Sequence, residues 1–279
     1  MAHHLLPFIP TTLALVLFLS STLAQNALFT EPLQILFAGK NITSGDLTLS
    51  LSHDCSLILY KTGSPVLDFN TSVSSSQCAL FIDIDGQLLL VPETERLPVG
   101  TVGAVTHQGR YALLFINGKL GIFGPAMWTN GATWPYYSHH HEIRQSRLSS
   151  GYSDYLLFSG EKVSGNADGE VVLAENGKLS AVITSRCSLA VKFNGSVPVW
   201  HTWPESESPE KCQLELKSNG ELVLEGLDVQ WTGGFAGEEN EYVCVLRFNG
   251  EILIYGLKTW LYNEEGLAQH QNIINVVIA

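Results

Sequence analysis

The chain has 279 residues, of which 45% are hydrophobic and 15% charged, and its net charge is −12 at neutral pH. This length exceeds the usual size of a single domain and leaves room for two cores. The acidic balance argues against nucleic acid or an anionic membrane as a partner, because both require a basic protein surface.

The amino-terminal segment has the composition of a secretory signal peptide. Residues 1–24 contain no Lys, Arg, Asp or Glu, and an apolar run from Leu13 to Leu19 precedes Thr22-Leu23-Ala24. The usual positive n-region is missing, and a membrane anchor is the alternative, but the run is well short of the ~20 residues that span a bilayer. We therefore expect a secreted chain, extracellular or vacuolar, without membrane insertion.

Four landmarks recur at a nearly constant offset of about 132 residues, which indicates tandem duplication of one module. The landmarks are Cys55, Cys78, Gly118 and Trp128, followed by Cys187, Cys212, Gly250 and Trp260. The predicted segments are a signal peptide at 1–24, a first domain at 25–130, a linker at 131–153, a second domain at 154–263 and a tail at 264–279. The linker is either a plain tether or a processing site, and the tail is either a removable propeptide or a sheet-pairing strand.

Short apolar runs that follow polar turns predict an all-β fold, because no stretch shows a long 3.6-residue period. Asp-Gly or Asn-Gly precedes four of these runs, and such dipeptides favour hairpin turns, which need positive φ. These dipeptides are Asp85-Gly86, Asn117-Gly118, Asn219-Gly220 and Asn249-Gly250. Each module is thus predicted to contain about three similar hairpin-bearing subunits.

The cysteines suggest two disulfides, since the secretory pathway permits them and four of the five form like-spaced pairs. The pairs are Cys55 with Cys78 and Cys187 with Cys212. Closing each loop would stabilise its module by about 3 kcal/mol. The remaining Cys244 lies in an apolar run and is expected to be a buried thiol.

Three Asn-x-Ser/Thr sequons, at Asn41, Asn70 and Asn194, predict a glycoprotein. Their occupancy does not follow from the sequence alone.

No motif indicates an enzyme, a cofactor or a bound metal. The cluster His139-His140-His141-Glu142 has no second ligand set, and adjacent histidines in an extended segment point to opposite sides, so we interpret it as a solvated linker patch. Asp83 and Asp85 could in principle flank a glycosidic bond, but their i, i+2 placement fits one face of a strand better.

Several segments resemble the bulb-type, monocot mannose-binding lectins. Residues 240–246, Asn249-Gly250 and Trp260 resemble that family's closing subdomain, and residues 54–60 with Cys78 match its disulfide-bearing strand. The resemblance covers residues 35–128 and 156–260. It implies two tandem β-prism II domains, each of three four-stranded antiparallel sheets with pseudo-threefold symmetry. It also implies exchange of C-terminal strands, and hence a dimer, a cleaved two-chain protomer or a larger homo- or hetero-oligomer.

That family binds mannose through Gln-x-Asp-x-Asn-x-Val-x-Tyr, without metal. Alternate residues of a strand share one face, so amide, carboxylate and hydroxyl groups bind the sugar while the aliphatic residue packs on its ring. The complete motif is nowhere present in this chain. The best copy is Ser52-x-Asp54-x-Ser56-x-Ile58-x-Tyr60, and the next is Asp83-x-Asp85-x-Gln87-x-Leu89-x-Val91, which lacks the Tyr.

The other four copies are poorer. Phe115-x-Asn117-x-Lys119-x-Gly121-x-Phe123 predicts a filled or abandoned groove. Those of the second module are Thr184-x-Arg186-x-Ser188-x-Ala190-x-Lys192, Lys217-x-Asn219-x-Glu221-x-Val223-x-Glu225 and Arg247-x-Asn249-x-Glu251-x-Leu253-x-Tyr255.

The tryptophans are predicted to have a structural role, since the family packs three of them around the axis of each domain. Trp200, Trp231 and Trp260 are expected in the second module, and Trp128 in the first, where Leu67 replaces another.

The resemblance implies a non-enzymatic lectin that binds glycans or glycoproteins, either mannose or mannose-containing and complex N-glycans, best in the first domain. The alternative is a storage or defence protein that has lost sugar binding.

Overall fold

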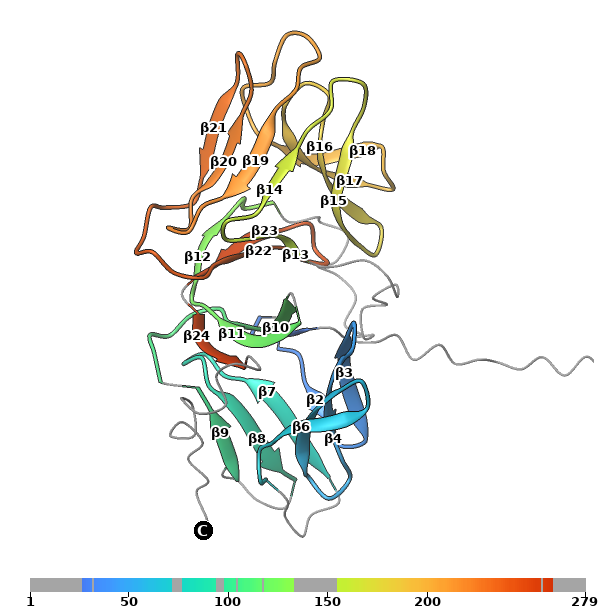
Figure 1. Ribbon diagram of the computed structural model, residues 1–279, viewed down its shortest axis with the longest axis vertical. Coiled ribbons are helices and arrows are strands. Elements are labelled where there is room, and N and C mark those ends of the chain that lie inside the picture. Colours follow the sequence, from blue (N-terminus) through green and yellow to red (C-terminus); the bar gives the residue numbers. More distant parts are fainter. Residues whose placement is uncertain are drawn as a thin grey trace, which may run out of the picture.

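The structure is a computed structural model that describes residues 27–31, 33–71, 77–93, 98–103, 105–116, 118–132, 155–256 and 258–262. The expected signal peptide and tail, most of the linker and its His cluster lie outside these residues. The strands within them form six four-stranded antiparallel sheets (Figure 1). The predicted all-β class is confirmed. The described segments include no helix that is long and apolar enough to cross a membrane.

Three sheets make up the first half of the molecule, here called the N-module. In sheet order, the first is β3 (Lys40–Ser44), β4 (Leu47–Leu51), β5 (Leu57–Lys61) and β6 (Ser64–Asp68). The second is β2 (Leu36–Phe37), β7 (Cys78–Ile82), β8 (Leu88–Pro92) and β9 (Gly100–Val102). The third is β1 (Ala27–Phe29), β10 (Ala112–Ile116), β11 (Lys119–Phe123) and β24 (Lys258–Tyr262).

The other three sheets form the C-module. Its first is β15 (Val171–Asn176), β16 (Leu179–Ile183), β17 (Leu189–Phe193) and β18 (Val197–His201). Its second is β14 (Lys162–Ser164), β19 (Gln213–Leu216), β20 (Leu222–Glu225) and β21 (Gln230–Gly233). Its third is β12 (Ala126–Thr129), β23 (Ile252–Tyr255), β22 (Val243–Leu246) and β13 (Tyr155–Phe158).

Two strands are exchanged between the modules. β24, near the end of the chain, pairs with β11 of the N-module, with Ile122 opposite Trp260. β12, which follows β11 in the sequence, pairs with β23 of the C-module, with Thr129 opposite Leu253. Figure 1 shows β24 beside β11 in the lower module and β12 beside β23 in the upper one. Sheet membership therefore does not follow the predicted segments 25–130 and 154–263, and the exchange takes place within one chain.

The exchange decides which tryptophans meet. Trp128 packs against Trp231, with ring centroids 5.9 Å apart, and Trp231 packs against Trp200 at 6.3 Å in the C-module. Trp260 lies against Phe69 of the N-module at 6.2 Å. The assignment of Trp128 to the first module and Trp260 to the second is wrong, because each lies on a strand that crosses to the other module.

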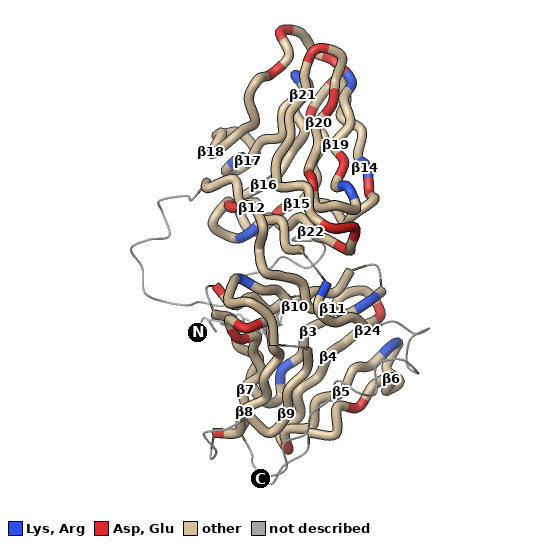
Figure 2. The backbone as a smooth tube through the Cα atoms, turned by 90° about the vertical axis from the view of Figure 1, so that its left-hand side faces the viewer, with Lys and Arg blue, Asp and Glu red and all other residues tan. Residues whose placement is uncertain are grey.

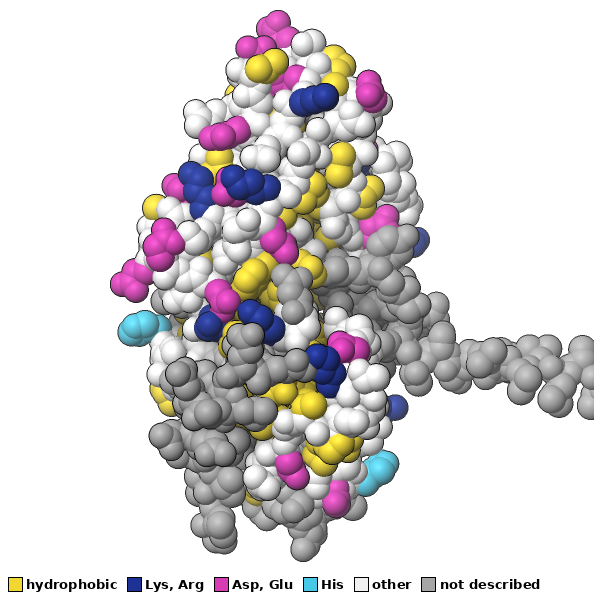
Figure 3. Space-filling view, in the orientation of Figure 1, with side chains coloured by type: hydrophobic (Ala, Val, Ile, Leu, Met, Phe, Trp, Pro, Cys, Tyr) yellow, Lys and Arg dark blue, Asp and Glu magenta, His cyan; other side chains and the backbone are white. Residues whose placement is uncertain are grey.

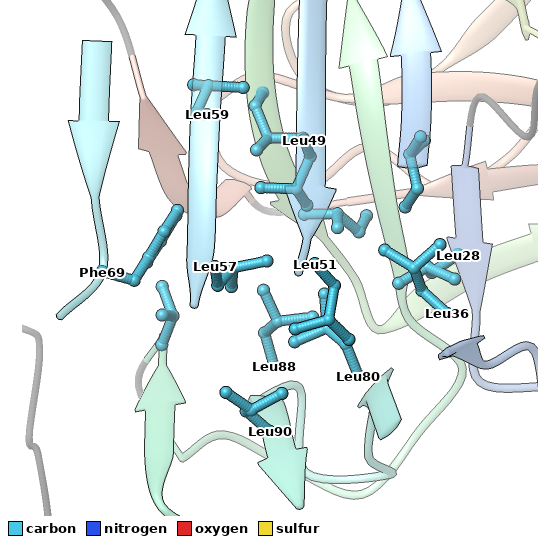
Figure 4. Close-up of a cluster of buried hydrophobic side chains, with 14 of the residues drawn as sticks. Leu28, Leu36, Leu49, Leu51, Leu57, Leu59, Phe69, Leu80, Leu88 and Leu90 are labelled. Atoms are coloured by element: carbon cyan, nitrogen blue, oxygen red, sulfur yellow. The ribbon is translucent and has the colours of Figure 1, made fainter. Parts of the chain in front are cut away.

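The hydrophobic core of the N-module is formed by alternate residues of its strands. Along β4, β5, β7 and β8 the inward Leu, Ile and Cys residues are buried while the outward residues are only partly so. Leu49, Leu57 and Leu88 are among the side chains that converge in the N-module core (Figure 4). Each such buried Leu stabilises the fold by roughly 1.5–3 kcal/mol. By contrast, every residue of β10, β22 and β23 is buried. The third sheets of the two modules pack against each other, which buries their central strands on both faces.

Candidate functional site

The turn between β4 and β5 has a buried support. The Cys55 N–H donates to the Ser52 carbonyl (3.1 Å), and Cys55 adopts a left-handed φ of 64°. On the core side of the turn, the Thr71 hydroxyl accepts the Leu57 N–H (3.0 Å) and donates to the Cys55 carbonyl (2.9 Å). Because Thr71 is itself buried, the turn is fixed independently of solvent, and its alternate side chains face outward.

A disulfide joins this turn to β7. It links Cys55 and Cys78, whose Cα atoms are 5.8 Å apart and which are 23 residues apart in sequence. At the equivalent place in the C-module, Cys187 and Cys212 are free, buried thiols, so the second predicted disulfide is absent from the structure. Burial raises the pKa of both thiols, and the neighbouring Cys212 and Glu210 raise that of Cys187 further.

The remaining thiol, Cys244, is fully buried, as expected for its apolar run.

The five residues of the best motif copy lie on one solvent-facing side of the first N-module sheet. In β5, Ile58 lies opposite Ser50 and Tyr60 opposite Thr48, whereas the intervening Leu59 is buried. We call this face the Tyr60 groove. It is formed by Ser52, Asp54, Ser56, Ile58 and Tyr60, all at least partly exposed.

Hydrogen bonds hold the Asp54 carboxylate in its charged form. Its Oδ1 accepts the Ser52 hydroxyl and, at 3.3 Å, the Ser56 N–H. The Ser52 bond, followed by the Ser56 bond, lowers the pKa of Asp54 below its ordinary value. Among the described residues, the bonds to Asp54 for which an atom is assigned go to Oδ1, the Ser56 side chain also interacts with the carboxylate, and no hydrogen bond engages the Tyr60 hydroxyl. The groove therefore presents a carboxylate oxygen, an aliphatic side chain and a phenol hydroxyl to a ligand.

The second predicted copy of the motif lies on a different sheet, in the turn before β8 and in β8 itself. Several of its polar groups form hydrogen bonds within the protein. Asp83 Oδ1 accepts the N–H groups of Asp85 (3.0 Å) and Gln87 (2.8 Å). The Gln87 side-chain amide donates to the Gly103 carbonyl at 3.4 Å. These groups close a turn, so fewer of them remain for a ligand than in the Tyr60 groove.

The strand face beside this turn is mainly apolar. Leu89 lies between Phe81 and Thr101, and the next row across the sheet contains Phe37, Ala79 and Val91. Phe37 is 55% exposed. The structure thus places Asp83, Asp85, Gln87 and Leu89 together, but apart from the first five residues and with an apolar neighbour surface.

The equivalent sheet of the C-module repeats the turn but not the groove. The Thr184 N–H donates to the Ser188 carbonyl (2.8 Å), and Cys187 has a φ of 55°. Arg186 stands where the N-module has Asp54, and its Nε donates to the Ser206 carbonyl (2.7 Å). Figure 2 shows basic and acidic residues interspersed over this module.

The C-module also lacks the side chains that the N-module has at Ile58 and Tyr60. Lys192 replaces Tyr60 and forms an ion pair with Glu170, and Ala190 replaces Ile58 and is buried.

The third grooves are filled by aromatic side chains from the opposite module. Phe158 of β13 lies edge-on to Phe123 of β11, with ring centroids 6.2 Å apart. Reciprocally, Phe29 of β1 lies 6.0 Å from the Tyr255 ring, and the Arg247 guanidinium is 3.8 Å from the Phe29 ring. Figure 3 shows hydrophobic side chains around the level where the modules meet. The sequence predicts a filled or abandoned groove for the third copy of the first module; Phe158 lies against it, beside a small remaining pocket lined by Lys119, Gly121 and Phe123.

Of the two Phe residues expected there, Phe115 instead packs into the N-module core, and Asn117 lies outside the described residues. Sequence reasoning missed Phe29 and Phe158, because both precede the landmarks of their modules and belong to no motif.

A partly buried ion pair also joins the modules. Arg110 donates two hydrogen bonds to Glu251 (2.8 and 2.6 Å), and the Thr129 hydroxyl adds a third (2.9 Å). Burial alone would raise the pKa of Glu251, but the bonds from Arg110 and Thr129 outweigh it and the pKa is lowered. Bidentate Arg–carboxylate geometry fixes orientation as well as charge, so this pair sets how the two third sheets meet.

Known proteins share this architecture. The chain is 28% identical over 266 residues to a mannose-specific lectin of Colocasia esculenta, covering 93% of this chain and 94% of that protein. It is 27% identical over 259 residues to a mannose-specific lectin of Crocus vernus, covering 90% and 94%. No protein-family model matches the chain.

Among solved structures, the fetuin-binding, two-domain agglutinin of Scilla campanulata has a similar fold. Its TM-score is 0.70 at 19% identity, and the match covers 85% of this chain and 100% of that one. This likeness confirms the two β-prism modules that the sequence resemblance implied. With six four-stranded sheets and sequence similarity to mannose-specific lectins along most of its length, the chain is similar to the bulb-type lectins and has the fold of a two-domain β-prism lectin.

Proposed function

We propose that the protein binds mannose or mannose-containing glycans through the Tyr60 groove, without metal and without catalysis. The observation that carries this proposal is that Ile58 and Tyr60 project from one face of β5 beside the exposed Asp54 of the preceding turn, with no hydrogen bond to the Tyr60 hydroxyl among the described residues. Relatives named as mannose-specific lectins support it.

The expected affinity is low. Ser52 and Ser56 stand where the family motif has longer amides, and the Ser52 side chain is occupied within the turn. Each missing hydrogen bond costs ~1 kcal/mol of binding free energy. A branched glycan that contacts neighbouring residues, such as an oligomannose or complex N-glycan, is therefore a better candidate ligand than a single mannose.

The test is a glycan array with the full chain and two variants. Asp54→Ala combined with Tyr60→Phe removes the carboxylate and the phenol hydroxyl of this surface, and we expect it to abolish the signal. Arg186→Ala changes the equivalent position of the C-module and serves as the matched control, with unchanged binding. Array signals that survive the double variant would place the sugar site elsewhere.

A second candidate function is a storage or defence protein that binds no sugar. It is favoured by the other grooves, which are filled, ion-paired or beside an apolar face. Blank arrays for the wild-type chain would select this alternative. Secretion to the extracellular space or vacuole and assembly into dimers or larger oligomers belong to both proposals, whereas glycoprotein partners belong to the first alone.

A further inference from the structure

One of the sequons lies on the same sheet face as the Tyr60 groove. Asn41, in Asn41-Ile42-Thr43, is on the edge strand β3 and lies opposite Ser50 of β4, which in turn lies opposite Ile58 of β5. Residues in one row across an antiparallel sheet point to the same side. The adjacent Ile42 is fully buried in the core while Asn41 is exposed, so Asn41 projects outward with Ile58.

The separation is short compared with an N-linked oligosaccharide. Neighbouring strands are about 4.8 Å apart, so Asn41 lies about 10 Å from Ile58 across the sheet. The next row repeats the relation, because Thr43 lies opposite Thr48, which lies opposite Tyr60. Within the described part of the chain, no hydrogen bond engages the Asn41 side-chain amide. Its Nδ2 is thus available on the open face.

We propose that Asn41 carries an N-linked oligosaccharide that lies over the Tyr60 groove and limits its access to external glycans. In the transfer step, Asn41 Nδ2 forms a bond to C1 of the first N-acetylglucosamine of a lipid-diphosphate-linked donor, the C1–O bond to the diphosphate breaks, and the amide loses one proton. The inference rests on the proposed function of the groove, because a cover matters only where a glycan binds.

The sequon of the C-module provides a contrast. Asn194 occupies the tip of the β17–β18 hairpin, in a left-handed conformation with φ of 48°, and its side chain is exposed. It lies in the other module, so an oligosaccharide there does not share a sheet face with the Tyr60 groove. Asn194→Gln is therefore the control for the general effect of losing a glycan.

The experiment uses the full chain, secreted from a eukaryotic host, with occupancy of Asn41 measured by mass spectrometry. Thr43→Ala destroys the sequon and Thr43→Ser retains it, while both leave Asn41 in place. Binding to an immobilised oligomannose glycan is then compared. If the cover leaves the groove open about a tenth of the time, Thr43→Ala binds roughly tenfold more tightly than wild type, and Thr43→Ser and Asn194→Gln bind like wild type. Enzymatic removal of N-glycans should produce the same rise.

Two results would overturn the cover and leave the lectin function intact: an unoccupied Asn41 in the binding-competent wild type, or equal affinities of Thr43→Ala and an occupied Thr43→Ser. A Thr43→Ala protein that folds normally by circular dichroism but binds no glycan would overturn the proposed function and the cover together.

Discussion

The first sheets of the two modules have the same turn and opposite surface chemistry. In both, a left-handed cysteine closes the turn, and a buried threonine, Thr71 or Thr202, accepts the N–H of the leucine that begins the next strand. On the outer face, Asp54 and Tyr60 of one sheet correspond to Arg186 and Lys192 of the other. The backbone support has been kept, whereas the side chains that meet solvent have changed.

The difference follows from what each position contributes to stability. Substituting a buried residue such as Thr71 leaves unpaired backbone groups, which costs roughly 1–3 kcal/mol. Substituting an exposed residue usually changes stability by less than ~0.5 kcal/mol. The outer faces were therefore free to diverge, to ion pairs in the C-module and to a potential sugar groove in the N-module.

The largest expected effect comes from removing an aromatic side chain that fills a third groove at the contact between the modules. Phe29→Ala removes a buried ring that packs against Tyr255 and under Arg247, and we expect a loss of about 3–4 kcal/mol in the free energy of unfolding. Chemical denaturation measures the change. Phe37→Ala, at a position 55% exposed in the same module, should change stability far less. Equal losses would show that Phe29 does not hold the modules together.

The cross-link is the next largest difference between the halves. Replacing Cys55 and Cys78 together by Ala should cost about 3 kcal/mol more than replacing Cys187 and Cys212 together, because both changes remove two buried sulfurs but only the first removes a loop closure. The measurement is thermal or denaturant unfolding of both double variants under non-reducing conditions. Similar losses would indicate that the C-module is cross-linked as well.

A smaller effect is expected on the affinity of the Tyr60 groove for mannose. Ser56→Asn restores an amide at a position where the turn uses the backbone N–H, so the turn should be preserved. One additional hydrogen bond of ~1 kcal/mol corresponds to roughly fivefold tighter mannose binding. Titration calorimetry or glycan-array dose responses measure it, with Ser56→Ala as the control that gains nothing. Tighter binding by the Ala variant would contradict a hydrogen-bonding role for this position.

The smallest effect concerns pH. Because the pKa of Asp54 is lowered, its carboxylate remains charged throughout the range from pH 8 to 5, and glycan binding should be constant there. Binding should fall only in stronger acid, as the pH drops through the lowered pKa of Asp54. The pKa of Glu251 is lowered too, so the stability that it contributes at the module interface is likewise present above its unfolded pKa and lost in acid. Unfolding must therefore be followed in parallel. A titration of binding near pH 6 in folded protein would contradict the role of Asp54.

Much of the scaffold could be predicted because its signals are local. Alternation along β5 placed Ile58 and Tyr60 on one face, with Asp54 in the turn before the strand, and Asn-Gly and Asp-Gly turns marked the hairpins. The second predicted site illustrates the limit, since the pattern around Asp83 and Gln87 is polar but the structure uses those groups to close a turn. Whether a polar side chain is free for a ligand depends on its neighbours in space.

By itself, the sequence determined the duplication, the all-β class and the face of the Tyr60 groove, because each depends on spacing along a single strand or between repeats. The family resemblance implied an exchange of C-terminal strands, but only the tertiary structure decided that β12 and β24 are exchanged within one chain and that Phe29 and Phe158 close the opposite grooves. β12 and β24 are equivalent strands of the two repeats. Each could therefore form the same backbone hydrogen bonds, and place its Trp in a similar pocket, in either module. The choice between them rests on the packing of the two third sheets, which no local pattern encodes.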